Sequence, residues 1–246
     1  MRILAIDTAS EQVSVAIGSA SAVEAAFHIA SDRRHVEALA PAIQLLLGNL
    51  GITVHDLSAV AVDVGPGLFT GMRVGVATAR TIAALSELPL VGVDSLTAVA
   101  FGTLRVSPSD VDSADVVVPV LDARRGQVYW SMYRNNFSAS QPLEAVRQPR
   151  VGDVAELIED LMDRGQRALL VGTGALRYVE ELRACPETFR IGDVSGLGSF
   201  AFNPDVPNAS VILSIAAGAI ESGASADAVE PMYLRAPDAE INWSTR

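Results

Sequence analysis

The stretch ILAIDTASEQVSVAI, residues 3–17, decides the fold, because the chain repeats its pattern in VVVPVLDARRGQVYW, residues 116–130. Each copy begins with an apolar strand that ends in an aspartate, passes through a short turn and returns as a second strand. At an offset of 115 residues, Asp7 falls on Asp122. Because the coincidence lies at the same point of each strand–turn–strand unit, the sequence indicates two structurally similar halves.

Helical and strand patterns alternate after each hairpin, which is typical of an α/β fold. The first half predicts strands at 22–29, 59–64 and 90–93 and helices at 33–50, 71–87 and from about 94 onward. The second half predicts helices at 153–164 and 210–222, a strand at 167–171, loose chain after the hairpin and a loop at 184–207. We expect lobes at 1–104 and 116–246, joined by a linker at 105–115 that is rich in Ser, Asp and Pro.

Two hairpins that end in aspartate ahead of α/β segments resemble the two-lobed actin-like fold of sugar kinases and chaperone ATPases. In that fold the hairpins and a later glycine turn face phosphate, metal and adenosine in a cleft. The resemblance implies a residual nucleotide cleft at Asp7, Thr8, Asp122, Gly172 and Gly174. A structural interpretation of Asp7 is also open, in which its carboxylate accepts hydrogen bonds from the turn that follows.

A glycine-rich block, GPGLFTGMRVGVATAR at residues 65–80, follows the apolar run at 59–64. A strand, a glycine loop and a helix start can together hold phosphate. A Walker A loop needs a lysine, however, and all 18 basic residues are arginines. The dinucleotide fingerprint also fails, because its third glycine lies one residue late and Pro66 has no N–H. The block therefore predicts a tight turn that begins a helix.

Small residues recur at every fourth position of the helix expected at 71–87 and form one ridge. They are Gly71, Gly75, Ala79 and Ala83. Packing on the protein's own sheet and docking of a partner helix both explain such a ridge, and docking is the hypothesis we carry forward. Arg73 and Arg80 share one helix face, where a partner's carboxylate could bind them.

Composition narrows the class of protein. The chain has 246 residues, a mean hydropathy of +0.32 and a net charge of −11. No apolar run approaches the ~20 residues of a membrane helix, and the first strand begins at once, which leaves no room for a signal peptide. The single cysteine, Cys185, excludes an intramolecular disulfide and suits the cytoplasm. The acidic balance argues against nucleic-acid binding by this chain alone.

The histidines argue against a metal site. A peptidase-like relative of this fold would hold its metal with a His-x-x-x-His pair on one helix face. The chain has His28, His35 and His55, and the residue four positions after His35 is Leu39. No nucleophile with a neighbouring base can be assembled either. We expect no metal and no catalytic residues.

Four segments resemble the TsaB (YeaZ) family, the dimerisation subunit of the bacterial tRNA threonylcarbamoyladenosine machinery. They are residues 3–9, 65–75, 121–129 and 230–235. The similarity runs from the first strand almost to the C-terminus, with Leu68 where the family usually has Ser and Gln127 where it often has Glu.

The resemblance implies a cytoplasmic subunit without chemistry of its own. A TsaD-type partner would carry the metal and transfer threonylcarbamoyl to the adenosine beside the anticodon, and a TsaE-type ATPase would join the complex. ATP or ADP is expected on those partners, and tRNA would meet this chain only through the complex. The implied interface uses helices 33–50 and 71–87, through His35, Glu37, Gly71, Arg73, Gly75, Ala79 and Ala83.

Other assemblies and activities stay open from the sequence. An apolar docking face without its partner makes the isolated chain a candidate homodimer. An ATP-dependent phosphotransferase that uses Asp7 with Mg·ATP is one alternative function. A metallopeptidase-like protein is the other.

Overall fold

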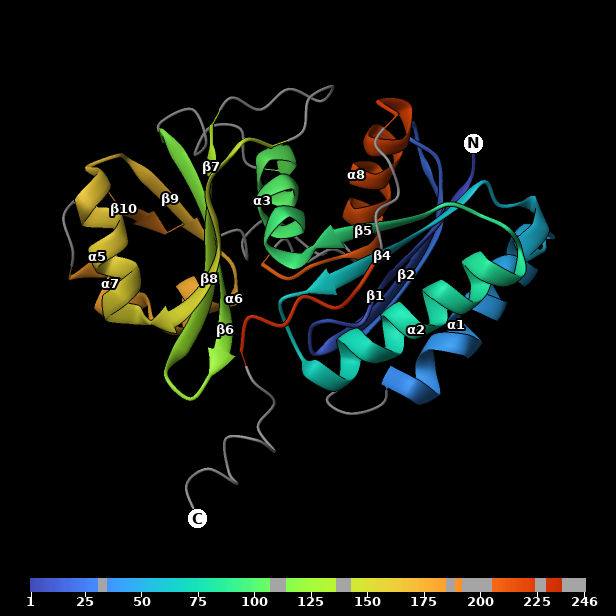
Figure 1. Ribbon diagram of the computed structural model, residues 1–246, viewed down its shortest axis with the longest axis horizontal. Coiled ribbons are helices and arrows are strands. Elements are labelled where there is room, and N and C mark those ends of the chain that lie inside the picture. The colour runs from blue at the N-terminus through green and yellow to red at the C-terminus, as the bar shows by residue number, and fades with distance from the viewer. Residues whose placement is uncertain are drawn as a thin grey trace, which may run out of the picture.

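The structure is a computed structural model, and it describes residues 1–30, 35–106, 114–135, 143–184, 189–191, 205–223 and 229–235. Two five-stranded sheets form the centres of two lobes (Figure 1). The N-terminal sheet contains β1 (Ile3–Asp7), β2 (Gln12–Gly18), β3 (Val23–Ala30), β4 (Ala59–Gly65) and β5 (Leu90–Asp94). The C-terminal sheet contains β6 (Val116–Arg124), β7 (Gln127–Arg134), β8 (Ala145–Asp153), β9 (Ala168–Val171) and β10 (Phe189–Ile191).

The two sheets have the same topology. Their strand orders are β3-β2-β1-β4-β5 and, read in the equivalent direction, β8-β7-β6-β9-β10. The first strand of each half pairs antiparallel with the second and parallel with the fourth. Asp7 and Asp122 lie at matching places near the ends of β1 and β6. The predicted duplication is confirmed, and a hairpin followed by parallel crossovers in each half is the actin-like architecture.

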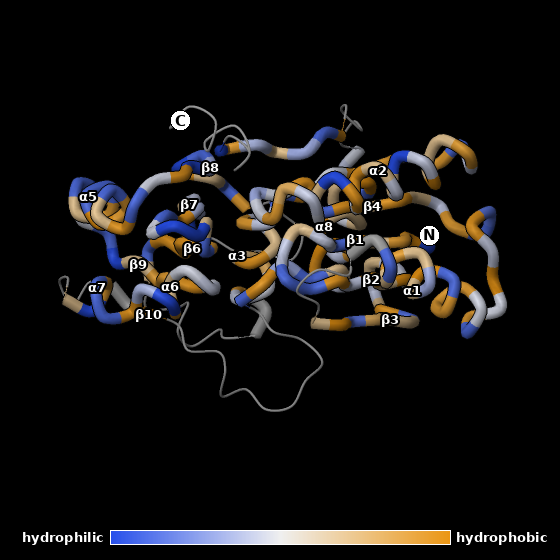
Figure 2. Tube along the Cα trace, turned by 90° about the horizontal axis from the view of Figure 1, so that it is seen from below, coloured by the Kyte–Doolittle hydropathy of each residue, from blue (hydrophilic) through white to orange (hydrophobic). Residues whose placement is uncertain are grey.

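Helices cover the outer face of each sheet and fill the space between the sheets. They are α1 (His35–Leu50), α2 (Phe69–Leu85), α3 (Ser95–Val106), α5 (Val154–Arg164), α6 (Thr173–Arg177), α7 (Val179–Arg183), α8 (Ala209–Glu221) and the 3₁₀ helix η1 (Val54–Asp56). The outer face of the N-terminal sheet packs against α1 and α2, and that of the C-terminal sheet against α5, α6 and α7. Hydrophobic residues dominate the central strands β1 and β4 (Figure 2).

Two helices, α3 and α8, lie between the sheets (Figure 1). From the N-terminal half, α3 buries Leu96 and Val99 against the C-terminal sheet. From the end of the chain, α8 buries Ile212 and Ala216 against the N-terminal sheet. This packing corrects the predicted lobe at 116–246, because α8 completes the core of the other lobe.

The structure also adds two strands that the sequence does not predict. β8 lies where loose chain was expected. Its sequence does not reveal a strand, because register irregularities opposite Trp130 and Met132 of β7 break the two-residue alternation between β7 and β8. β10 has three residues and lies inside the predicted loop at 184–207, too short to carry a pattern. Cys185 and most of the linker at 105–115 fall outside the described residues. None of the helices in the described ranges has the length and apolarity that a membrane crossing requires.

Candidate functional site

Two aspartates meet at the carboxyl ends of the neighbouring parallel strands β1 and β4. Asp7 and Asp63 are both fully buried. The Asp7 carboxylate accepts hydrogen bonds from the Ala9 N–H at 2.9 Å and from the Ser14 hydroxyl at 3.3 Å. Asp7 therefore organises its own turn and the adjacent strand, which agrees with the structural interpretation of this residue, although the donors are not the side chains of the turn.

Asp63 has one satisfied oxygen and one unsatisfied oxygen. Its Oδ1 accepts hydrogen bonds from the Gly65 N–H and the Ser95 hydroxyl, both at 2.7 Å. Its Oδ2 is buried and has no hydrogen-bond partner among the described residues. An unpaired buried carboxylate oxygen is costly, so this atom requires a proton donor.

The carboxyl group of Asp7 can supply this proton, because the pKa values of both aspartates are raised. Burial, and then the charge of Asp63, raises the pKa of Asp7 well above its usual range. Burial raises the pKa of Asp63 to about 7, even though hydrogen bonds from Ser95 and Gly65 act in the opposite direction. Two ionised carboxylates side by side in a dry interior would repel each other. Both pKa shifts favour retention of a proton by the pair, and the Asp7 carboxyl group is the neighbour that could donate it to Asp63.

The carboxylate pair is connected to both of the helices that lie between the sheets. The Ser14 hydroxyl accepts a hydrogen bond at 2.9 Å from the N–H of Ala209, the first residue of α8. Ser95, which donates to Asp63, is the first residue of α3. The pair therefore fixes the starts of α8 and α3 relative to the N-terminal sheet.

A third carboxylate, which is partly buried, continues this polar network into the other lobe. Asp94, at the end of β5, accepts hydrogen bonds from the N–H and the hydroxyl of Thr97. The Thr97 hydroxyl also lies 2.7 Å from the hydroxyl of Tyr133 on β7. Burial raises the pKa of both Asp94 and Tyr133. The network thus joins the two sheets through the first turn of α3.

The glycine loop packs directly on the turn that follows Asp7. The Leu68 N–H donates to the Ala9 carbonyl at 2.7 Å, and a Cβ at Gly67 would collide with the same oxygen. The Thr8 hydroxyl donates to the Gly71 carbonyl at 2.7 Å. Thr8, like Asp7, is completely buried. Asp7 and Thr8, which were predicted to belong to a residual nucleotide cleft, are therefore buried beneath the glycine loop.

The small-residue ridge of α2 faces the protein's own sheet. Its four members, Gly71, Gly75, Ala79 and Ala83, are all buried. A Cβ at Gly75 would collide with the Thr8 hydroxyl oxygen, so β1 and α2 approach too closely for any side chain there. This corrects the docking hypothesis for these four residues. The exposed side of α2 instead presents Arg73 and Arg80.

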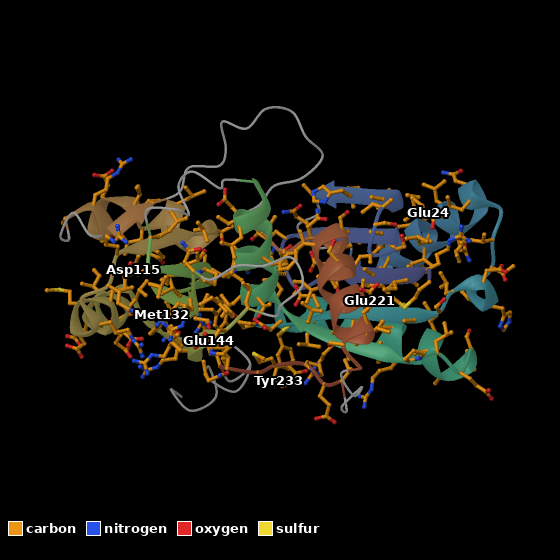
Figure 3. All side chains as sticks on the ribbon, turned by 90° about the horizontal axis from the view of Figure 1, so that it is seen from above. Glu24, Asp115, Met132, Glu144, Glu221 and Tyr233 are labelled. Carbon is orange, nitrogen blue, oxygen red and sulfur yellow. The ribbon has the colours of Figure 1, made fainter. Side chains whose placement is uncertain are left out.

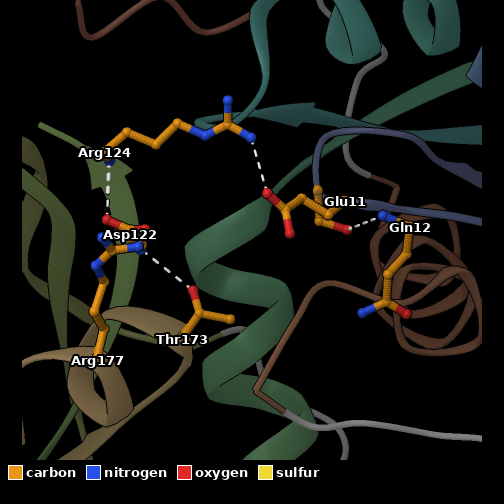
Figure 4. Close-up of polar contacts among 7 residues, drawn as sticks. Glu11, Gln12, Asp122, Arg124, Thr173 and Arg177 are labelled. Carbon is orange, nitrogen blue, oxygen red and sulfur yellow. Dashed lines mark hydrogen bonds and ion pairs between the residues drawn. The ribbon is translucent and has the colours of Figure 1, made fainter. Parts of the chain in front are cut away.

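In the C-terminal lobe, Asp122, which was expected to face a nucleotide, is bonded to neighbouring residues of the same lobe (Figure 4). Asp122 accepts hydrogen bonds from the Arg124 N–H and from an Nη of Arg177, both at 2.9 Å. The Asp122 N–H donates to the Thr173 hydroxyl at 3.2 Å. The Asp122 side chain keeps 18% of its surface exposed. Unlike Asp7, it therefore remains partly accessible.

Gly172 and Gly174, on either side of Thr173, allow this segment of the chain to approach β6 closely. Gly172 has a φ of +102°, and a Cβ there would lie 2.6 Å from the Val120 carbonyl oxygen. Gly174 packs equally tightly against β6. Gly174 is buried and Gly172 is enclosed by Val120, so the structure brings them next to β6 and not to an open surface.

One ion pair joins the tips of the two hairpins. Arg124 extends from the β6–β7 turn, and its Nη2 lies 2.8 Å from Oε1 of Glu11 in the β1–β2 turn (Figure 4). Both side chains are more than half exposed, so water screens this contact. This ion pair links the two hairpins, and it does not place a catalytic group between them.

The remaining predicted residues lie on or near the outer helices. Glu37 is exposed on α1, and Leu45 on the same helix is 50% exposed. His35 begins α1, but its side chain lies outside the described residues. In the described part of the chain, no group of three or more His, Cys, Asp or Glu residues could hold a metal ion.

Sequence reasoning missed the partners of the predicted residues. Asp63 could have been identified from the sequence, because it is a lone carboxylate inside the apolar run at 59–64. Asp94, directly before a helix start, had the pattern of a helix cap. Tyr133 had none, because its contact joins residues 36 positions apart in different lobes.

Comparisons with known proteins agree on one group of relatives. Residues 28–181 match the family model of TsaD, described as tRNA N6-adenosine threonylcarbamoyltransferase. The tRNA threonylcarbamoyladenosine biosynthesis protein TsaB of Escherichia coli is 35% identical over 240 residues, covering 96% of this chain and 95% of that protein. The Bacillus subtilis TsaB is 28% identical over 243 residues, covering 99% and 98%. A crystal structure from Pseudomonas aeruginosa, described as similar to peptidase YEAZ, superposes with a TM-score of 0.76 at 26% identity, covering 95% of this chain and 99% of that one.

Proposed function

The chain belongs to the TsaB (YeaZ) family of tRNA threonylcarbamoyladenosine biosynthesis proteins, and we propose that it is a non-catalytic subunit that supports a TsaD-type threonylcarbamoyltransferase. One observation carries the non-catalytic part of this proposal. The glycine loop is packed on the turn after Asp7, and the carboxylate that would orient a metal or phosphate is buried against Asp63. These groups hold the fold together and do not face a substrate.

The N-terminal lobe supplies the proposed docking face. Helices α1 and α2 cover the sheet with their buried sides, and their outward sides carry Glu37, Leu45, Arg73, Arg80 and Leu85. Leu45 is 50% exposed and Leu85 is 78% exposed, so this face offers apolar surface that a partner could bury. We infer that a helix pair of the TsaD-type subunit covers this face, and that a second copy of the chain covers it when the subunit is absent.

The other components follow from this assignment. A TsaE-type ATPase completes the proposed complex, and the metal and the ATP or ADP bind to those partners. With a net charge of −11, this chain meets tRNA only through the complex. The site of action is the cytoplasm, where tRNA is modified.

Reconstitution with omission of single components tests the proposal. Threonylcarbamoyladenosine formation on tRNA should need this chain in addition to the TsaD-type and TsaE-type subunits, and sedimentation should show a stoichiometric complex with the TsaD-type subunit. Asp7→Asn should preserve this support, because an amide can still bond within the buried pair.

The alternative activity makes the opposite prediction. If Asp7 works with Mg·ATP as in a phosphotransferase, the chain alone should bind ATP stoichiometrically in a calorimetric titration and transfer its phosphoryl group. Asp7→Asn should then abolish the transfer. Either of these results with the isolated chain would refute the non-catalytic assignment.

A further inference from the structure

The last described segment of the chain returns to α2 and builds an exposed cluster on it. The rings of Phe69 and Tyr233 lie 4.9 Å apart, and the guanidinium carbon of Arg73 lies 3.8 Å from the Phe69 centroid. Nε of Arg73 donates to the Tyr233 hydroxyl at 2.8 Å. Tyr233 is 44% exposed and lies at the periphery of the molecule, on the tail between the lobes (Figure 3).

Both lobes hold this tail in place. The Met232 N–H donates to the Val64 carbonyl at the end of β4 at 2.7 Å. Nη1 of Arg235 donates to the Ala123 carbonyl in the β6–β7 hairpin at 2.8 Å. Because Tyr233 lies between these two anchors, its ring is pre-positioned, and a ligand would not have to order it.

The guanidinium of Arg73 has N–H donors on its Nη atoms that are available to a ligand. Arg73 uses Nε for Tyr233, and no carboxylate within the described residues lies within ion-pair distance of it. The Phe69 ring lies against the guanidinium and the Tyr233 hydroxyl accepts from its Nε, which holds the group in place and leaves the Nη atoms for a bidentate acceptor. On a chain of net charge −11, such a fixed positive group complements a carboxylate.

We propose that Phe69, Arg73 and Tyr233 bind a carboxylate-bearing segment of the partner subunit, so that the tail at 229–235 is part of the docking surface. This rests on the proposed function, which places a TsaD-type subunit on the adjacent face of α2. Arginine and tyrosine are among the residue types that most often dominate binding energy at interfaces. The carboxylate would displace water from the Nη atoms, while its neighbouring apolar atoms pack on the exposed Tyr233 ring.

Binding of the purified TsaD-type subunit, measured by calorimetry, tests the proposal. Arg73→Gln and Tyr233→Ala should each weaken the complex by at least about thirty-fold, which is the size of an interface hot spot. Arg73→Lys should fall in between, since it keeps the charge and loses the planar fork. Arg183→Gln is the matched control, because it removes the same charge from an exposed position on α7 and should leave the affinity within about threefold.

Each result has a distinct meaning. If the wild-type chain binds the TsaD-type subunit and all four variants bind it within threefold, the tail is not part of the interface, and only this inference is overturned. If the wild-type chain does not bind, the proposed function fails as well. Urea unfolding of every variant, compared with that of the wild type, establishes whether the fold is intact. Should Tyr233→Ala loosen the tail, Tyr233→Phe keeps the ring and tests the hydroxyl contact alone, with a smaller expected loss.

Discussion

The shared proton of Asp7 and Asp63 predicts that the protein loses stability as the pH rises. A carboxyl group whose pKa is raised by folding adds stability that is complete below the unfolded pKa and is lost as the pH rises through the folded pKa. Burial moves the pKa of Asp63 from 3.8 to about 7. At about 1.4 kcal/mol for each pKa unit, the whole shift corresponds to roughly 4 kcal/mol, of which roughly 2–3 kcal/mol is lost between about pH 5 and pH 8.

Asp7→Asn should reduce the pH dependence without abolishing it, because the variant removes the titration of Asp7 while Asp63 stays buried and keeps its raised pKa. The amide that this substitution introduces imitates the protonated carboxyl group, because it donates to Oδ2 of Asp63 and still accepts the hydrogen bond from Ala9. The free energy of unfolding, from urea titrations followed by circular dichroism at pH 5, 6, 7 and 8, should therefore fall with pH in both proteins, and less steeply in the variant, which retains only the loss that comes from Asp63.

Two comparisons make this result specific. Asp7→Ala removes the donor, leaves Asp63 unpaired and should destabilise the protein at every pH tested. Asp115→Asn is the control for an ordinary carboxylate, since Asp115 is exposed and Arg167 holds its pKa at about 2. Its variant should follow the wild-type profile over this range. A wild-type stability that is level from pH 5 to pH 8 would refute the shared proton.

Two further predictions concern close packing. Gly75→Ala should cost roughly 1–3 kcal/mol of unfolding free energy, because the new methyl group meets the Thr8 hydroxyl; Gly48→Ala on α1, where a Cβ meets nothing within 4 Å, should be neutral or stabilising by up to about 1 kcal/mol. Equal effects in thermal unfolding would contradict the close approach of α2 and β1. Trp130→Phe should cost roughly 1–3 kcal/mol, since buried Asp160 loses the indole N–H donor at 3.1 Å. An unchanged urea midpoint would show that water replaces this bond.

Much of the architecture was predictable because it is encoded locally. The hairpins, the strand at 59–64 and the helix at 153–164 have clear periodicity, and the last of these has a capping box at Asp153 and Glu156. β8 was not predictable, because its alternation is broken by the irregular register opposite Trp130. Its place as an edge strand is set by β7 and not by its own sequence.

The site was predictable only in its individual residues. Asp7 was recognisable from the end of its strand, but its meaning depends on Asp63, which comes from the neighbouring parallel strand. The ridge of α2 was recognisable from its spacing, but spacing alone cannot distinguish a sheet from a partner helix. Thr8 decides between them, since its hydroxyl bonds the Gly71 carbonyl and fills the space over Gly75. Such contacts between distant segments are fixed by tertiary packing.

The exchange of α3 and α8 between the lobes has a consequence for synthesis of the protein. Ser14 in the second strand needs the N–H of Ala209, 195 residues later, and the sheet face beside it needs the whole of α8. While the chain is being translated, the first lobe therefore leaves the ribosome with one apolar face uncovered, and it cannot complete its core until the last helix has emerged. A premature stop before Ala209 would thus leave the N-terminal sheet without the helix that covers one of its faces.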